Sequence, residues 1–361
     1  MRMLKICYTC LLFLLVITAN TLAAEYTVTD LGTLGGDESF GYGINNSGDA
    51  VGESKISSGN FHAFLYNGSS MIDLGTLGGV YGAAFDINDS AHVAGYASLP
   101  SGYVHAYIYN GSTKNDLGTL GGNESWARGI NESDYVAGYS TVSSGNTHAF
   151  LYNGTTMIDL GTLGGSNSYA YKVNESNIVV GFSEDGSGNK RGFIYDGSMT
   201  ALSTLGGADS RAFAINDSNK IVGNSTTGTG ETHAFYYDGT SMMDLGTLGG
   251  GTSSTARDIN NSGLIVGFGY DSLSVQKAFV YGGDYTTLTD LNTLIDIWSG
   301  WTLNTAYGIN ELGQIVGVGT FNGETHAFLL TPNPVPEPVS IVLVGLGIAG
   351  LIRRYIRNIN I

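Results

Sequence analysis

The chain has 361 residues, with 31 acidic and 15 basic side chains and a formal net charge of −16 at neutral pH. This excess of negative charge disfavours nucleic acid and anionic membrane surfaces as partners, because both carry charge of the same sign. The only cysteines, Cys7 and Cys10, precede residue 25, so the rest of the chain can form neither a disulfide nor a thiolate site.

Residues 1–24 are predicted to be a secretory signal peptide. Arg2 and Lys5 give it a positive start, residues 11–18 form its apolar run, and Ala23 and Ala24 are small enough for a cleavage site. This segment predicts export of the protein.

Residues 25–331 are built from a repeated motif, Asp-Leu-Gly-Thr-Leu-Gly-Gly. It occupies residues 30–36, 73–79, 116–122, 159–165 and 244–250, with degenerate copies at 201–207 and 290–296. Successive copies begin 42 to 46 residues apart, and such a fixed period is typical of repeat architectures. Two further signatures, Ile-Asn followed by Val-Gly, and His-Ala-Phe-Leu-Tyr (HAF), also occur seven times, with substitutions.

Each repeat predicts four short strands. In the first repeat these are residues 39–45, 50–54, 61–66 and 71–74, which are rich in β-branched and aromatic residues and are separated by Asn- and Gly-containing turns. Four strands per period of about 43 residues are typical of a β-propeller blade. The fold class predicted is therefore all-β, a seven-bladed β-propeller with four-stranded blades.

The two ends of the repeat region predict how the ring closes. Residues 25–31 form a fourth strand with no earlier strands before it, and residues 325–330 form a third strand with no fourth strand after it. Pairing the two would complete the last blade and remove exposed strand edges. The first strand of each repeat should be innermost, because its third residue is always small: Gly41, Ala84, Ala127, Ala170, Ala212, Ala256 and Ala306. We expect the aromatic residue of each HAF signature to fill the space between blades.

The C-terminal 30 residues differ in character from the repeats. Residues 332–338 contain four prolines and should form an extended linker, and residues 339–352 are apolar except for Ser340. A helix over residues 339–361, ending in a basic tail, would be a short transmembrane anchor, because 14 residues span about 21 Å of a ~30 Å hydrocarbon core.

This tail resembles the PEP-CTERM sorting signal of Gram-negative bacteria. Val335, Pro336, Glu337 and Pro338 match its motif, and the apolar stretch and the basic residues Arg353 and Arg354 follow in the same order. The repeats, with His62-Ala63-Phe64 and its copies, resemble the HAF-repeat extracellular family, which often carries this tail. The resemblance implies export, handling by an exosortase, display on the cell envelope or in the extracellular matrix, and no known enzymatic activity.

Several aromatic residues fall near the loops that should share one face of the disc. They are Phe40, Tyr81, Trp126, Tyr169, Trp298 and Trp301. Exposed aromatic rings among polar residues are typical of sugar-binding surfaces, so these six are our candidate ligand face. The alternative is that each ring packs between blades.

Other motifs have structural explanations that we favour. The HAF histidines could suggest a metal site, but Arg191 and Lys277 replace two of them, which favours a hydrogen-bonding role. The Gly-rich motif lacks the ending of a phosphate-binding loop and is interpreted as a crossover between strands. Gly345-x-Gly347-x-x-Gly350 lies in the apolar tail, where small residues in a membrane helix explain it better than a dinucleotide site. No cofactor is expected, and Ca²⁺ is considered only because of the net charge.

The sequence thus predicts an exported binding or structural module of the cell surface, and the sharper hypothesis is that it binds extracellular polysaccharide. The alternative is a carbohydrate-active enzyme, a glycoside hydrolase or lyase, with a carboxylate pair at the mouth of the propeller channel. No catalytic or metal-ligating residue can be assigned from the sequence.

Overall fold

The computed structural model describes residues 25–334, in which all regular structure is β-strand apart from one 3-10 turn, η1 (Leu291–Thr293). The all-β class predicted from the sequence is therefore confirmed. The signal peptide, the motif residues Val335 to Pro338, the tail helix, and Arg353 and Arg354 lie outside the described residues. Over residues 25–334, no helix has the length and apolarity needed to cross a membrane.

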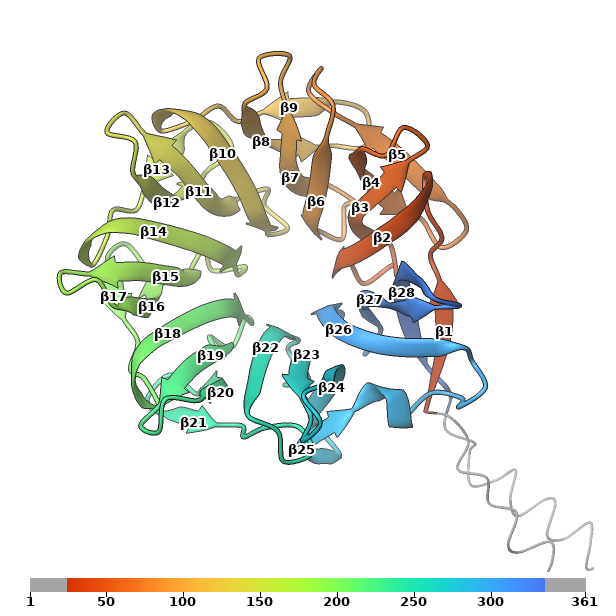
Figure 1. The fold of residues 1–361 in the computed structure, drawn as a ribbon. Helices are drawn as coiled ribbons and strands as arrows, with labels where there is room; N and C mark the ends of the chain where they lie inside the picture. The colour runs from red at the N-terminus through yellow and green to blue at the C-terminus, as the bar shows by residue number, and fades with distance from the viewer. Residues whose placement is uncertain (1–24, 335–361) are drawn as a thin grey trace, which may run out of the picture.

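Consecutive strands pair antiparallel in sets of four, arranged around a central axis (Figure 1). The strands nearest the axis are β2 (Gly35–Ile44), β6 (Gly82–Ile87), β10 (Gly121–Ile130), β14 (Gly164–Val173), β18 (Gly206–Ile215), β22 (Ser253–Ile259) and β26 (Trp301–Ile309). The second strands are β3 (Ala50–Ile56), β7 (Val93–Ser98), β11 (Val136–Val142), β15 (Val179–Asp185), β19 (Ile221–Thr227), β23 (Ile265–Tyr270) and β27 (Ile315–Phe321). The third strands, which carry the HAF signature, are β4 (Phe61–Tyr66), β8 (Val104–Tyr109), β12 (Thr147–Tyr152), β16 (Lys190–Tyr195), β20 (Thr232–Tyr237), β24 (Gln276–Gly282) and β28 (Glu324–Pro332). The outermost strands are β5 (Met71–Gly75), β9 (Lys114–Asp116), β13 (Met157–Asp159), β17 (Met199–Ala201), β21 (Met242–Asp244), β25 (Tyr285–Asp290) and β1 (Tyr26–Asp30).

The first strand of the repeat region pairs with the last HAF strand, as the sequence predicts. β1 lies antiparallel to β28, with Tyr26 opposite Pro332 and Asp30 opposite Phe328. The described sheets contain either four or eight strands, and none of them closes on itself. The larger sheets are neighbouring four-stranded units joined by a single parallel pair, such as Glu38 with Thr325.

In four units the inner strand begins earlier than we expected from the sequence. In the first unit β2 starts at Gly35, not at residue 39, and the same holds for β10, β14 and β18. The glycine pair of the repeated motif therefore belongs partly to the inner strand and not only to the crossover. Gly35 has a φ of 98°, and a Cβ on Gly36 would lie 2.5 Å from the Cβ of Lys55, so both positions favour glycine.

Neighbouring units pack closely along these inner strands, which explains the small residue that recurs in them, Gly41 in the first unit. A Cβ on Gly41 would lie 2.5 Å from a side-chain carbon of Val316 in the preceding unit. The HAF ring Phe64 is completely buried in a cluster that includes Val316 and Ala327 of that same unit. The expected filling of the inter-unit space by HAF aromatics is thus observed, and the core consists of apolar layers between units.

A cycle of buried asparagines connects the units near the axis. The Nδ2 of each Asn donates to the main-chain carbonyl of the equivalent Asn in the next unit, and Asn310 donates to Asn45, where the cycle began. Each Oδ1 accepts main-chain N–H groups of its own turn, as Asn131 does from Ser133 and Tyr135. The members are Asn45, Asn88, Asn131, Asn174, Asn216, Asn260 and Asn310. This bonding explains the Asn of the Ile-Asn signature.

The glycine of the Val-Gly signature should be essential to stability. In the fourth unit, a Cβ on Gly181 would lie 1.9 Å from the carbonyl oxygen of Tyr169 and 2.9 Å from the ring of Phe193. We expect Gly181→Ala to lower the free energy of unfolding by about 3 kcal/mol or more, because β14, β15 and β16 would have to move apart. Chemical denaturation measures the loss. Gly186→Ala in the same unit, where the nearest atom is 3.9 Å away, is the control and should have little effect.

Candidate functional site

Every inner strand carries a β-bulge at the same position. The register against the second strand shifts across one residue in each unit, for example between Ala127 and Gly129. A bulge turns an additional side chain out of the regular alternation. The skipped residues are Tyr42, Phe85, Arg128, Tyr171, Phe213, Arg257 and Tyr307. The repeated bulge therefore brings one large side chain from each unit to the central cavity.

These seven side chains contact one another in a closed ring around the axis. Its ring–ring contacts, all at 5.1 or 5.2 Å between centroids, join Tyr42 to Phe85, Tyr171 to Phe213, and Tyr307 to Tyr42. Two guanidinium groups complete the ring by stacking on aromatic faces on either side of them. Arg128 lies 3.8 Å from the centroid of Phe85, and Arg257 lies 4.7 Å from that of Phe213. We call this set the aromatic–arginine ring.

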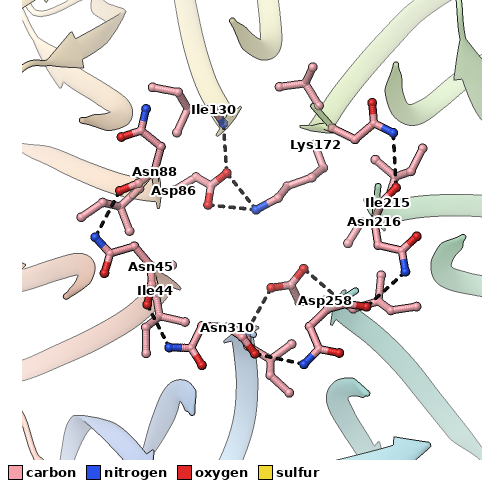
Figure 2. Close-up of a pocket in the computed structure, with 18 of the residues that line it drawn as sticks. Ile44, Asn45, Asp86, Asn88, Ile130, Lys172, Ile215, Asn216, Asp258 and Asn310 are labelled. Atoms are coloured by element: carbon pink, nitrogen blue, oxygen red, sulfur yellow. Dashed lines mark hydrogen bonds and ion pairs between the residues drawn. The ribbon is translucent and has the colours of Figure 1, made fainter. Parts of the chain in front are cut away.

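The ring borders a central cavity of about 590 Å³. Beyond the ring, the cavity is lined by the residue after the bulge in five of the units, by six members of the asparagine cycle, and by the residues that follow the asparagines. Figure 2 shows Asp86, Lys172 and Asp258 pointing into this cavity, with the asparagines around its edge. The cavity therefore opens at the turns between the first and second strands.

Charged side chains break the repeat at one layer of this cavity. The residue after the bulge is Gly or Ala in four units: Gly43, Gly129, Ala214 and Gly308. In the other three units it is Asp86, Lys172 or Asp258. All three of these departures from the repeat line the cavity.

Asp86 and Lys172 form an ion pair between inner strands that are not consecutive. The Nζ of Lys172 lies 2.9 Å from both carboxylate oxygens of Asp86, and Oδ2 of Asp86 also accepts the N–H of Ile130 at 2.9 Å. Burial disfavours the charged lysine, but the carboxylates of Asp86 and Asp258 outweigh it and raise the pKa of Lys172. Lys172 therefore stays a cation in the cavity.

Asp258 lies on the opposite side of the cavity and makes no ion pair within 4.0 Å in the described part of the chain (Figure 2). Its oxygens accept the main-chain N–H groups of Ile259 and Ile309, each at 3.0 Å. Burial raises the pKa of Asp258 to about 6, against the smaller opposing effect of Lys172. The carboxyl group of Asp258 thus keeps its proton to a higher pH than an ordinary aspartate does.

The outer edge of the cavity is a second hydrogen-bonded cycle. The side chain of each residue after the asparagine accepts the main-chain N–H of its counterpart in the preceding unit, for instance Asp89 from Asn46 at 2.8 Å. The members are Asn46, Asp89, Glu132, Glu175, Asp217, Asn261 and Glu311. Five of them are carboxylates, so the mouth of the cavity is strongly acidic while its members also tie the units together.

The six aromatic residues of the predicted ligand face do not line this cavity. Trp126 and Tyr169 lie close together, since both contact the ring of Tyr139 at 5.1 and 5.0 Å. Within their own units, Phe40 contacts Phe61 with the two rings tilted, and Trp301 stacks on Phe321. Tyr81 is partly exposed, and Trp298 is 86% exposed in the loop before β26. The role of this face in ligand binding stays a prediction.

The HAF histidines take the structural role that we expected. In five units the Nδ1 of this histidine lies within 3.0 Å of the Asp of the repeated motif, as for His105 and Asp116. The same carboxylates accept main-chain N–H groups of their own turns, as Asp116 does from Gly118. Where Ala201 replaces the Asp, Arg191 replaces the histidine and contacts Asp185. Among residues 25–334, no group of three or more His, Cys, Asp or Glu side chains is arranged to hold a metal ion.

Sequence reasoning missed the residues of the cavity. The signal was present, because the two positions just before the Ile-Asn signature vary between units: the first is aromatic or arginine, and the second is Gly, Ala, Asp or Lys. This variation indicates cavity-lining side chains only if the β-bulge is known, and the periodicity of the sequence does not reveal a bulge.

Residues 203–335 match the model of a family described as a protein of unknown function, DUF3466. The matched segment is well under half of the chain. No curated protein matches the sequence.

Solved structures resemble the fold. The β-propeller domain of the Trilobed protease from Pyrococcus furiosus aligns with a TM-score of 0.51 at 8% identity, over 81% of this chain and 93% of that one. A puromycin-hydrolyzing peptidase from Mycobacterium tuberculosis aligns with a TM-score of 0.54 at 11% identity, over 86% of this chain and 54% of that one. The fucose-recognising lectin of Aleuria aurantia gives a TM-score of 0.41 at 13% identity, over 73% of this chain and 94% of that one, which is too weak to argue from. The first two likenesses show a propeller-like fold and nothing about activity.

Removing one partner of the cavity ion pair should destabilise the protein. We expect Lys172→Met to lower the free energy of unfolding by about 2–4 kcal/mol, because Asp86 would be left as an unpaired buried carboxylate. The double variant Asp86→Asn/Lys172→Met should recover most of the loss. Urea denaturation of both variants and of Asp86→Asn forms a double-mutant cycle, and additive losses would contradict the pairing.

Asp258 should make stability depend on pH between about 4 and 6. Its folded pKa is raised above the unfolded value of 3.8, so the folded state holds this proton more tightly. The resulting stabilisation is complete below about pH 4 and is lost as the pH rises through about 6, by at most about 3 kcal/mol. Denaturation of the wild type and of Asp258→Asn across this range should show the difference. Parallel pH profiles would contradict the assignment.

Proposed function

We propose that this protein is an exported binding module whose ligand site is the central cavity. The proposal rests on one observation: the charged side chains that differ between equivalent positions of the units lie together in the cavity. Asp86, Lys172, Asp258, Arg128 and Arg257 come from four different units, yet all of them line one cavity. Residues that only stabilise the fold repeat from unit to unit, whereas these five residues differ from their counterparts in other units and line the cavity.

The chemistry of the cavity fits a sugar residue. Its volume of about 590 Å³ lies within the usual range for small-ligand sites. Aromatic rings on its inner side offer surfaces for the faces of a pyranose, and carboxylate and ammonium groups offer partners for hydroxyls. We therefore propose that the ligand is one residue, or the end, of an extracellular polysaccharide.

We also infer that the four-stranded units form a closed seven-bladed ring. The β1–β28 pairing supports this, because it supplies a fourth strand to the last unit. The asparagine cycle supports it too, because its hydrogen bonds pass through seven units and return to the first.

Export and surface display rest on the sequence. The signal peptide, the motif from Val335 to Pro338 and the basic residues Arg353 and Arg354 support sorting by an exosortase in a Gram-negative cell envelope. The cavity opens on one face of the ring, and a surface-held propeller could present that face to the surrounding matrix.

A carbohydrate-active enzyme is the second candidate function. Asp86 and Asp258 place two carboxyl groups in one cavity, and the raised pKa of Asp258 suits a proton donor. However, Lys172 holds both oxygens of Asp86, and main-chain N–H groups hold both oxygens of Asp258. Binding without turnover therefore fits the contacts better.

A binding assay separates these possibilities. The full chain would be tested against a panel of bacterial extracellular polysaccharides, including that of its native host. We expect Asp258→Asn to weaken binding about tenfold or more, because the cavity carboxyl is lost. Trp298→Ala, in a loop away from the cavity, should bind normally.

The other outcomes have distinct meanings. Loss of binding with Trp126→Ala alone would move the ligand site to the predicted aromatic face. Release of new reducing ends would favour the enzyme. Absence of binding to every polysaccharide would overturn the proposed function.

A further inference from the structure

Arg128 and Arg257 occupy the same bulged position in two units and are held by stacking. Arg128 lies between Phe85 and Tyr171, at 3.8 and 5.4 Å from the ring centroids. Arg257 lies between Phe213 and Tyr307, at 4.7 and 5.5 Å. Stacking on aromatic faces fixes the plane of a guanidinium group but does not use the N–H donors at its edge.

Within residues 25–334, these donors have no protein partner. Neither guanidinium lies within 4.0 Å of a carboxylate oxygen, and neither donates a hydrogen bond to another described residue. The Nε of Arg257 is buried without a hydrogen-bond partner. Buried polar atoms in proteins normally have a hydrogen-bond partner, so the unpaired Nε of Arg257 beside the cavity is an unusual cost to leave in a fold.

The charged side chains near Arg128 and Arg257 do not serve as counter-ions for them. Glu53 accepts a hydrogen bond from the hydroxyl of Tyr42 at 2.7 Å, and its burial raises the pKa of its carboxyl, which weakens it as a counter-ion for Arg128. Asp86 is held by Lys172. Burial and the neighbouring Arg128 both lower the pKa of Arg257. A negative charge is therefore missing at the aromatic–arginine ring.

We infer that the edges of Arg128 and Arg257 bind an oxyanion carried by the ligand of the cavity, an inference that rests on the proposed function. Guanidinium groups recognise carboxylates, sulfates and phosphates through paired N–H donors. With sugar as the ligand class, the anionic group is the carboxylate of a uronic acid or a sulfate or phosphate ester. The aromatic rings beside the arginines would contact the sugar ring that carries it.

The acidic mouth restricts which anionic ligands can enter. Its five carboxylates would repel a segment with many negative charges, while the arginines at the inner end attract a single one. The site therefore selects a ligand with one anionic group on an otherwise neutral or cationic body. A terminal acidic residue on a neutral chain has this character, and a polyanion does not.

Titration calorimetry with glucuronate and glucose on the full chain tests the inference directly. The two sugars differ mainly by the carboxylate, so wild-type protein should bind glucuronate about tenfold or more tightly than glucose at low salt. Arg257→Gln and Arg128→Gln should each remove this preference. Arg211→Gln is the matched control, because Arg211 also stacks on a ring, Phe182, but does not line the cavity.

Further measurements distinguish loss of binding from loss of folding, and specific anion binding from a general salt effect. Circular dichroism melting curves show whether each variant folds, and Arg257→Lys keeps the charge while losing the paired donors. Inorganic sulfate, titrated separately, shows whether the site takes any oxyanion or the carboxylate alone. Saturable sulfate binding that depends on Arg257 would support the anion site and extend it to sulfate esters.

Equal affinity for glucose and glucuronate, an unchanged preference in Arg257→Gln, or an equal loss in Arg211→Gln would each overturn the inference. Failure of the proposed function gives a different result, because glucuronate would then bind through the arginines while no polysaccharide binds. Polysaccharide binding without any carboxylate preference would leave the proposed function standing and remove only the anion site.

Discussion

The asparagine cycle is the interaction on which the rest of this structure depends. Each unit is four-stranded and cannot bury its own apolar faces, so it needs a neighbour on both sides. The buried amide of each asparagine fixes the turn of its own unit and the distance to the next. Because the hydrogen bonds return from Asn310 to Asn45, an error in one unit would propagate to all the others.

The inner strands have a regular backbone but carry different side chains at the positions that line the cavity. The same bulge occurs in each unit and turns one side chain toward the axis, whatever that side chain is. Five aromatic residues and two arginines occupy this position, and the next position adds Asp86, Lys172 and Asp258. A repeated backbone feature therefore presents side chains that do not repeat, and units of nearly the same structure enclose a cavity whose lining is asymmetric.

Much of the fold was readable from local signals. The period of the repeated motif, the Asn- and Gly-containing turns and the incomplete repeats at both ends predicted the four-stranded units and the pairing of β1 with β28. The substitution of Arg191 and Lys277 for histidine correctly indicated a structural role for the HAF position. The start of the inner strands was placed too late, because the glycine pair looked like a turn and its contact with Lys55 is not local.

The sequence by itself determined the repeating unit, the number of its copies and the charge of the chain, because these follow from spacing and composition. Only the tertiary structure decided which side chains share a cavity. Arg128 and Arg257 are 129 positions apart in the chain, and Asp86 and Lys172 are 86 apart. Nothing local to any one of them marks the others as neighbours, because the ring and its bulges bring them together only after every unit has packed.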